Sequence, residues 1–503
     1  MDWLVTVMEM GVKIITLPNY FVFIFIGLFI GVVFGAIPGI SGLMAIILLV
    51  PFTYPLDIIQ AMLLLTSTYC GGVFGGSISS ILLNTPGAPE SVCTSFDGYP
   101  MTQKGFAAKA LGTAIECSAI GGFLSAVVMT VACAPLASVA LSFDSPEYFA
   151  LVFMGLCVVT SISGKSLVNG VISLFIGLFL ASVGVSPIQG VPRYDLGFPQ
   201  LRAGIDFIIV MIGVFALGEI FTRFETLLRE ESKKIDGKVG TNLLTLKEFI
   251  KLKWTILRSF VMGTFIGFLP GAGATIASFV SYGMARNLSD NPGEFGKGAI
   301  EGVAAPETAN NAATGGAMIP LLTLGIPGGG ATAVMISAFM IKGLQPGPLV
   351  FMTNPELIGS IFVGMIIANL LIIIFGFIAV KAFTQFLKVP YTILASGITL
   401  FCFLGAFAKR NVMYDVWVML IFGVIGYFMK KHEYPVAPLV LGMVLGPLAE
   451  DKFLSSLISY HSDFLIFFKR PISGSMVVVA LCFLMYPLVM AVWKKRKEKR
   501  KIA

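Results

Sequence analysis

Charge is scarce in this 503-residue chain: 12% of the residues are charged, whereas 56% are hydrophobic. A set of soluble domains needs a charged surface, so this composition excludes that class. The chain has only two histidines, and its seven cysteines include no Cys-x-x-Cys pair. We therefore expect the cysteines to pack as small apolar side chains, and we expect no histidine metal site.

The chain contains several long stretches without a charged residue. They span residues 14–56, 58–89, 117–143, 166–192, 259–285, 308–341, 357–380, 416–429 and 471–493. A helix needs about 20 apolar residues to cross a bilayer. The sequence therefore predicts an all-α polytopic membrane protein with roughly 10–12 membrane segments in a lipid bilayer.

The formal net charge of +7 does not indicate a nucleic-acid partner. The basic residues gather at the ends of hydrophobic segments, in residues 223–255 and in the tail "KKRKEKRKIA". Basic residues beside membrane segments favour the cytoplasmic side, so we expect the connector and the C-terminus to be cytoplasmic.

An internal duplication is indicated by two motifs that recur in the same order. "GVVFGAIPGISG" and "GTFIGFLPGAGA" place Pro38-Gly39 and Pro270-Gly271 in register, 232 positions apart (270 − 38 = 232). "GGSISSILLNTPGAP" and "GGAMIPLLTLGIPGGG" then place Pro86-Gly87 and Pro327-Gly328 241 apart (327 − 86 = 241). Duplicated halves with interrupted helices are typical of secondary transporters.

The motifs divide the chain into four parts. We expect a first transmembrane repeat at 1–222, a charged cytoplasmic connector at 223–255, a second repeat at 256–465, and an extra C-terminal helix with a basic tail at 466–503. An odd number of crossings in each half makes the repeats inverted. Each half would contain Pro-Gly-broken helices or re-entrant hairpins.

The chemistry of a broken helix suggests where a ligand binds. Main-chain groups freed by proline cannot face hydrocarbon, so we expect the breaks to converge on a polar interior. N–H groups at a half-helix N-terminus suit an anion, and freed carbonyls suit Na⁺. The predicted substrate-binding residues are Pro38, Gly39, Ser41, Asn84, Thr85, Pro86, Gly87, Pro270, Gly271, Gly273, Thr275, Asn310, Asn311, Thr314, Pro327, Gly328 and Thr332. We expect Na⁺, or a proton in its place, at carbonyls near Gly39, Gly271 and Gly328 with Asn84 and Asn310, and no other cofactor.

Two groups of residues leave alternatives open. The helix glycines Gly31, Gly35, Gly263 and Gly267 can serve helix packing alone or the site itself. The acidic residues near the motifs either face water or cap helices, or they couple transport to a cation or proton; they are Glu90, Asp97, Glu301 and Glu307. Glu116 is the strongest candidate for a lone intramembrane carboxylate.

Two longer stretches resemble a known family. "YCGGVFGGSISSILLNTPGAPESVCTSFDGYPMTQKGFAAKALG" from Tyr69 and "EGVAAPETANNAATGGAMIPLLTLGIPGG" from Glu301 look like signature regions of the TctA family, the large membrane subunits of tripartite tricarboxylate transporters. The motif residues carried over are Pro38-Gly39, Asn84-Thr85-Pro86-Gly87, Pro270-Gly271, Pro306-Glu307, Asn310-Asn311 and Gly325-Ile326-Pro327-Gly328.

The resemblance implies uptake of an organic di- or tricarboxylate across a bacterial inner membrane, coupled to an ion gradient, commonly Na⁺. It also implies two protein partners, a periplasmic substrate-binding protein and a small membrane subunit.

Two rival functions remain. "GISG" around Ser41 matches a pattern of intramembrane serine proteases, but that chemistry needs a general base, and neither His432 nor His461 lies clearly within a span. A passive anion channel is the other rival. Paired breaks favour alternating access, so we expect a transporter rather than an enzyme.

Overall fold

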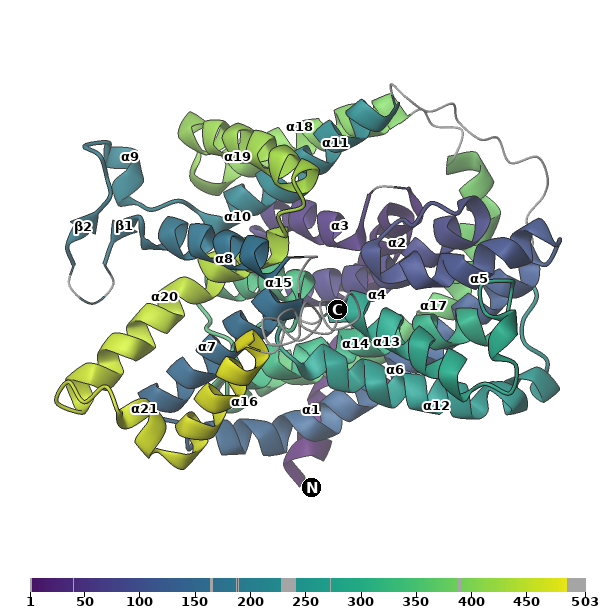
Figure 1. Ribbon diagram of the computed structural model, residues 1–503, viewed down its shortest axis with the longest axis horizontal. Coiled ribbons are helices and arrows are strands. Elements are labelled where there is room, and N and C mark those ends of the chain that lie inside the picture. The colour runs from purple at the N-terminus through teal and green to yellow at the C-terminus, as the bar shows by residue number, and fades with distance from the viewer. Residues whose placement is uncertain are drawn as a thin grey trace, which may run out of the picture.

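The computed structural model describes residues 2–38, 40–162, 166–186, 188, 190–227, 241–271, 273–386 and 391–485. Over these residues the chain is almost entirely helical, with one two-stranded hairpin (Figure 1). Before the connector lie α1 (Asp2–Ile15), α2 (Pro18–Ala36), α3 (Gly42–Leu49), η1 (Val50–Thr53), α4 (Ile58–Leu83), η2 (Pro89–Ser91), α5 (Val92–Gln103), α6 (Ala107–Ala140), α7 (Ser145–Ile162), α8 (Leu167–Ser182), β1 (Gly184–Val185), β2 (Pro192–Arg193), α9 (Pro199–Arg202), α10 (Phe207–Met211), the π-helix η3 (Ile212–Leu217) and α11 (Gly218–Leu227).

After the connector lie α12 (Leu246–Phe268), α13 (Gly273–Leu288), η4 (Pro292–Glu294), α14 (Glu301–Leu324), α15 (Gly330–Ile341), α16 (Val350–Thr353), α17 (Pro355–Phe386), α18 (Tyr391–Arg410), α19 (Met413–Lys431), α20 (Val436–Ser459) and α21 (Ile466–Lys469). A further apolar helix spans Pro471–Met485.

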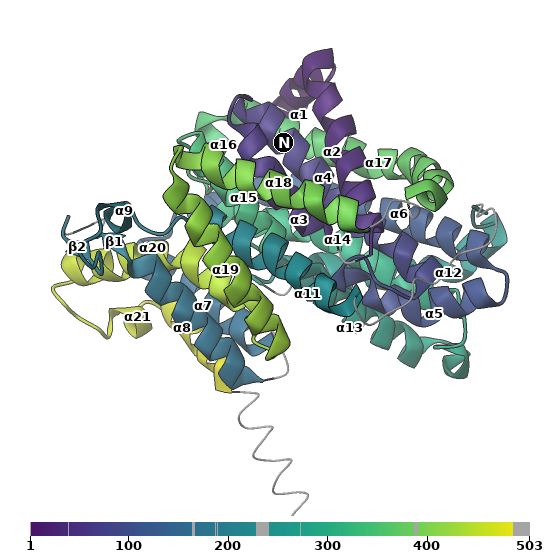
Figure 2. The same ribbon diagram turned by 90° about the horizontal axis from the view of Figure 1, so that it is seen from above.

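Two helices form the centre of the molecule. Every residue of α4 from Ala61 to Leu82 is buried, and so is every residue of α14 from Gly302 to Thr323. Both helices lie near the middle of the two views (Figure 1, Figure 2). They are rich in Gly, Ala, Ser and Thr, which let neighbouring backbones approach closely. These two helices therefore place small and hydroxyl-bearing residues at the centre of the molecule.

The outer helices carry large apolar side chains on their exposed faces. Phe175 is 64% exposed, Phe265 is 60% exposed and Trp417 is 61% exposed. Within the described residues, seven helices are long and apolar enough to cross a membrane, and five shorter apolar helices accompany them. The seven are Pro18–Ala36, Ile58–Leu83, Ala107–Ala140, Phe207–Glu225, Pro355–Lys381, Thr392–Arg410 and Met413–Lys431. The all-α polytopic class is confirmed.

One arrangement of three helices occurs on both sides of the connector. In the first half α2 breaks into α3 and packs against α4; in the second, α12 breaks into α13 and packs against α14. The halves also exchange contacts, because α6 packs against α14 and α17 packs against α4. The inverted orientation and the exact number of crossings stay predictions.

The connector meets the first half through Glu116. Residues 228–240, the middle of the connector, lie outside the described residues, as do the tail residues 486–503. The carboxylate of Glu116 accepts a hydrogen bond of 2.9 Å from the backbone N–H of Leu244, and Lys109 pairs with Glu248 close by. The interpretation of Glu116 as a lone carboxylate is therefore wrong, because a chain segment 128 positions away satisfies it.

The C-terminal helix is attached to α7 by Arg470. Its guanidinium pairs with the buried Glu147 and with Asp144 at 3.4 Å. Hydrogen bonds from the Tyr460 hydroxyl and the Ser145 N–H, together with Arg470, lower the pKa of Asp144 below its usual value.

Candidate functional site

The first break of each half has the same backbone geometry. The residue that follows α2, Ile37 (φ −76°, ψ 122°), and the residue that follows α12, Leu269 (φ −73°, ψ 123°), are both extended. A residue before proline avoids the helical region, so Pro38 and Pro270 end these helices in the same way. Pro38 is half-buried and Pro270 is buried. Gly39 lies outside the described residues.

New helices begin directly after these breaks. Ser41 caps α3, because its hydroxyl accepts a hydrogen bond of 3.3 Å from the Met44 N–H. In the second half Gly271 and Gly273 take left-handed φ values of 74° and 64°, which glycine adopts without strain. Thr275 follows in the first turn of α13 and is half-buried.

The second breaks follow the central helices. α4 is followed by Asn84, an exposed residue in the left-handed conformation (φ 54°), and α14 is followed by Gly325 (φ 71°). The Thr85 hydroxyl donates to the Leu83 carbonyl at 3.3 Å. Beyond the second break, Thr332 caps α15 by exchanging hydrogen bonds of 2.9 Å with the N–H and C=O of Gly329. The helix in the stretch 308–341 is thus interrupted between α14 and α15.

The glycine of each second break packs against the end of the first broken helix in the same half. A Cβ on Gly87 would lie 1.9 Å from the Gly35 carbonyl oxygen, and a Cβ on Gly328 would lie 2.8 Å from the Gly267 carbonyl oxygen. Pro327 is buried beside Gly328, and Pro86 is half-buried. Each half therefore brings its own two breaks together.

Within the second half, the Gly271 N–H donates to the Gly328 carbonyl at 2.9 Å. Contacts between the halves then join the two pairs of breaks. A Cβ on Gly330 would lie 3.1 Å from the side chain of Leu43 on α3. The loop helix η2 also packs against α13 and α14. All four breaks consequently meet in one region, with the N-termini of α3, α13 and α15 beginning there.

The helix glycines serve packing. A Cβ on Gly31 would lie 2.3 Å from the carbonyl oxygen of Thr68, and a Cβ on Gly263 would lie 2.3 Å from that of Ala309. Gly35 and Gly267 make the equivalent contacts one turn later. The packing alternative is confirmed for these four glycines.

The paired asparagines of α14 lie inside the molecule. Asn310, Asn311 and Thr314 are all 0% exposed. The Asn311 amide donates to the Asn310 side-chain oxygen at 2.8 Å, and the Thr314 hydroxyl donates to the Asn311 carbonyl at 2.7 Å. The Asn310 amide donates to the Glu90 carbonyl at 3.2 Å, so this helix reaches the loop after α4.

Two of the acidic residues that could have faced water are buried instead. Glu307 and Asp97 are both 0% exposed. Asp97 accepts hydrogen bonds from the backbone N–H groups of Gly296, Gly298 and Ala299 at 2.7–2.9 Å, and from the Tyr282 hydroxyl at 2.8 Å. Asp97 therefore fixes the loop before α14. Glu301 lies in the first turn of α14 and is half-buried, as a residue at a helix start.

The partners of Glu307 were missed from the sequence. Its two carboxylate oxygens accept hydrogen bonds from Thr94 of α5 and Ser118 of α6. These residues lie 213 and 189 positions away, and neither belongs to a repeated motif. No local signal in the sequence distinguishes them from the many other hydroxyl residues of the chain.

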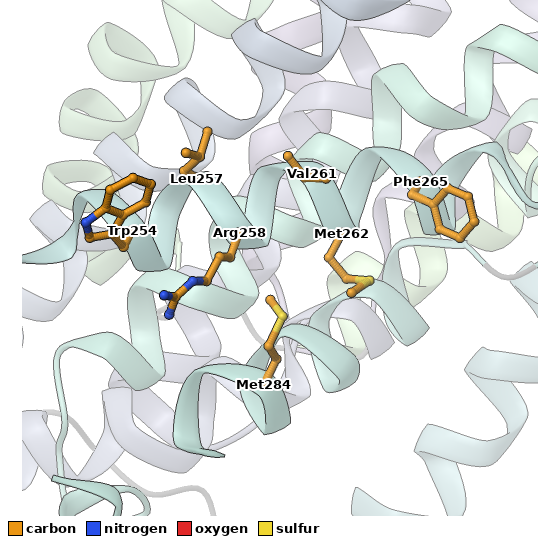
Figure 3. A pocket seen from close by; sticks show the side chains of 7 residues that line it. All are labelled: Trp254, Leu257, Arg258, Val261, Met262, Phe265 and Met284. Carbon is orange, nitrogen blue, oxygen red and sulfur yellow. The ribbon is translucent and has the colours of Figure 1, made fainter. Parts of the chain in front are cut away.

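A cavity of about 550 Å³ lies away from the breaks, on the outer side of α12 (Figure 3). Its lining is mostly apolar and comes from α12 and α13: Trp254, Leu257, Arg258, Val261, Met262, Phe265 and Met284. None of the predicted site residues lines it.

Helices of this all-α chain break in its interior, and its outer faces are apolar. These two features define a class, the polytopic membrane proteins whose interior is of the transporter type. The chain belongs to the tripartite tricarboxylate transporter TctA family, whose family model matches residues 21–441. It is therefore a multi-pass subunit of a tripartite transporter, from a family of transporter subunits rather than enzymes.

Two similar proteins come from Agrobacterium vitis. The "Uncharacterized 52.8 kDa protein in TAR-I ttuC' 3'region" is 36% identical over 496 residues, which cover 98% of this chain and 98% of that protein. The "Uncharacterized protein in TAR-II ttuC' 3'region" is 39% identical over 236 residues, covering 47% of this chain and 98% of that protein. No solved structure matches the chain.

Proposed function

We propose that this chain imports an organic di- or tricarboxylate across a bacterial inner membrane, driven by a cation gradient with Na⁺ as the coupling ion. A periplasmic substrate-binding protein delivers the substrate, and a small membrane subunit completes the transporter. The two halves act as inverted repeats, and the basic C-terminus lies in the cytoplasm.

The observation that carries the proposal is the meeting of the four breaks. Three helix N-termini, those of α3, α13 and α15, begin there, and each presents N–H groups and the positive end of a helix dipole. Such ends attract carboxylates, and the left-handed Gly273, which has no atom within 4 Å of the place of a Cβ, lets a ligand approach the backbone. The substrate-binding residues proposed from the sequence, apart from Gly39, which lies outside the described residues, belong to the segments at these breaks or to α14 beside them.

A passive anion channel is the second candidate, and a serine protease is disfavoured because the Ser41 hydroxyl caps α3. Sealed proteoliposomes containing the chain, its small membrane subunit and its binding protein separate transporter from channel. We would measure uptake of labelled dicarboxylates and citrate with and without an inward Na⁺ gradient, and with a proton gradient instead. Accumulation above the external concentration that requires a gradient supports the proposal. Equilibration that ignores both gradients identifies a channel.

We expect Asn84→Gly to lower uptake about tenfold, the effect of losing one hydrogen bond to a charged ligand. Glycine adopts the left-handed conformation of Asn84, so the thermal unfolding temperature should stay unchanged.

Asn411→Gly is the matched control. Asn411 is an exposed asparagine with φ 56° after α18, outside the region of the breaks, and its replacement should leave uptake unchanged. Equal uptake by wild type and Asn84→Gly would remove Asn84 from the site.

A further inference from the structure

A buried carboxylate connects the two halves of the molecule. Glu307 on α14 belongs to the second half, whereas its hydrogen-bond donors Thr94 and Ser118 belong to α5 and α6 of the first. All three side chains are 0% exposed. The amide of Asn310, one turn further along α14, lies 3.5 Å from the Glu307 carboxylate.

The carboxylate has no cationic partner to offset its charge. Among the described residues, no lysine, arginine or histidine nitrogen lies within 4.0 Å of Glu307. An ionised carboxylate in such an interior is strongly disfavoured unless a cation or a proton neutralises it. Ionisable groups in this position within membrane proteins mark ion and proton pathways.

A second feature points to a missing ligand. The side-chain oxygen of Asn311 is buried and has no hydrogen-bond partner, although the residue is 0% exposed. Its amide nitrogen donates to the main-chain carbonyl of Glu307 at 3.1 Å. Carboxylate, hydroxyl and amide oxygens together are the ligands that small hard cations take.

We propose that Glu307, with the hydroxyls of Thr94 and Ser118, binds the small cation, Na⁺ or a proton, whose gradient drives transport. This inference rests on the proposed function and moves the coupling site from the main-chain carbonyls near Gly271 and Gly328 to a side-chain carboxylate. The Gly328 carbonyl already accepts the Gly271 N–H.

The position of Asn310 explains how a cation at Glu307 is coupled to the substrate-binding region at the breaks. Its amide contacts the Glu307 carboxylate on one side and the Glu90 carbonyl, in the loop after α4, on the other. Neutralising Glu307 therefore changes the hydrogen bonding of a break that borders the substrate region. Because its ligands come from both halves, the cation also stabilises the arrangement in which α5 and α6 lie against α14.

Other titratable groups face Glu307 from the surrounding elements. They are Glu90 from η2, Cys93 from α5 and Cys117 from α6. A pH response is assigned to Glu307 only if it disappears in Glu307→Gln and persists in Glu90→Gln.

The first test measures cation binding to the purified full-length chain, without substrate. Thermal unfolding is followed with NaCl replaced by choline chloride and across a pH series. We expect wild type to be stabilised by Na⁺ or by a fall in pH, and Glu307→Gln to lose that response. Glu301→Gln, on the same helix, should keep it. A wild type that responds to neither cation, or a Glu307→Gln variant that responds as wild type does, overturns the proposal.

A second pair of variants keeps the test decisive if Glu307→Gln does not fold. Thr94→Val and Ser118→Ala each remove one hydroxyl and keep the carboxylate. Each should raise the half-saturating cation concentration about tenfold. An unchanged value in both contradicts the proposed ligand set.

The transport assay separates this inference from the proposed function. In proteoliposomes with the two partner subunits, Glu307→Gln should lose gradient-driven accumulation and retain exchange of labelled for unlabelled carboxylate. Accumulation equal to wild type overturns the cation site alone. If wild type binds the cation but moves none of the carboxylates, the proposed substrate class fails while the cation site stands.

Discussion

Gly263→Ala is expected to lower the free energy of unfolding by on the order of 3 kcal/mol, with a matching loss of folded protein. The added methyl would lie 2.3 Å from the Ala309 carbonyl oxygen and 2.7 Å from its Cα. Both atoms belong to the backbone of α14, so the clash is relieved only by moving α12 away from α14. Thermal unfolding in detergent and the yield of monodisperse protein measure the effect.

Gly31→Ala should cost a similar amount, because its Cβ would lie 2.3 Å from the Thr68 carbonyl oxygen of α4. Gly283→Ala is the control, since no atom lies within 4 Å of its Cβ. If Gly31→Ala and Gly263→Ala both unfold at the wild-type temperature, α2 does not pack closely on α4, nor α12 on α14.

Asp97→Ala has the second largest expected effect, a loss of about 2–3 kcal/mol of stability. It removes the acceptor of three backbone N–H groups and of the Tyr282 hydroxyl, and each unsatisfied donor costs about 1–3 kcal/mol when water does not replace the acceptor. Because the loop 296–299 is held by this carboxylate, its amides should exchange hydrogen faster. Hydrogen exchange followed by mass spectrometry measures the exchange rate of the loop amides, and thermal unfolding measures the stability of the whole chain.

Two variants calibrate that result. Tyr282→Phe removes one of the four hydrogen bonds and should cost about 1 kcal/mol. Asp290→Ala, an exposed aspartate just before the same loop, should change neither stability nor exchange. Slow exchange of residues 296–299 in Asp97→Ala would show that the loop is held by other contacts.

The helix breaks were predictable because proline and glycine act locally. Pro38 and Pro270 end their helices through their own rings, whatever surrounds them. The left-handed turn at Gly325 and the capping serine at position 41 are likewise properties of a few neighbouring residues. The positions that these motifs marked are the positions where helices end in the structure.

The roles of the acidic residues were not predictable in this way. Sequence placed Asp97 at a water-facing surface among its alternatives, whereas the fold buries it against a loop some 200 positions later. For the same reason, the contacts that Glu307 and Glu116 make in the structure were not expected from the sequence. The role of a carboxylate depends on the groups that it contacts. The partners Thr94, Ser118 and Leu244 lie far from these glutamates in the sequence.

The sequence alone determined that this protein lies in a membrane, where its helices break, and that its motifs recur in two halves, because hydropathy and proline stereochemistry need no distant partner. Only the tertiary structure decided that the four breaks meet and that Glu307 receives hydroxyls from the opposite half. Those contacts depend on how α4, α6 and α14 pack. The packing energy is spread over many weak contacts between distant segments, and no single stretch of sequence encodes it.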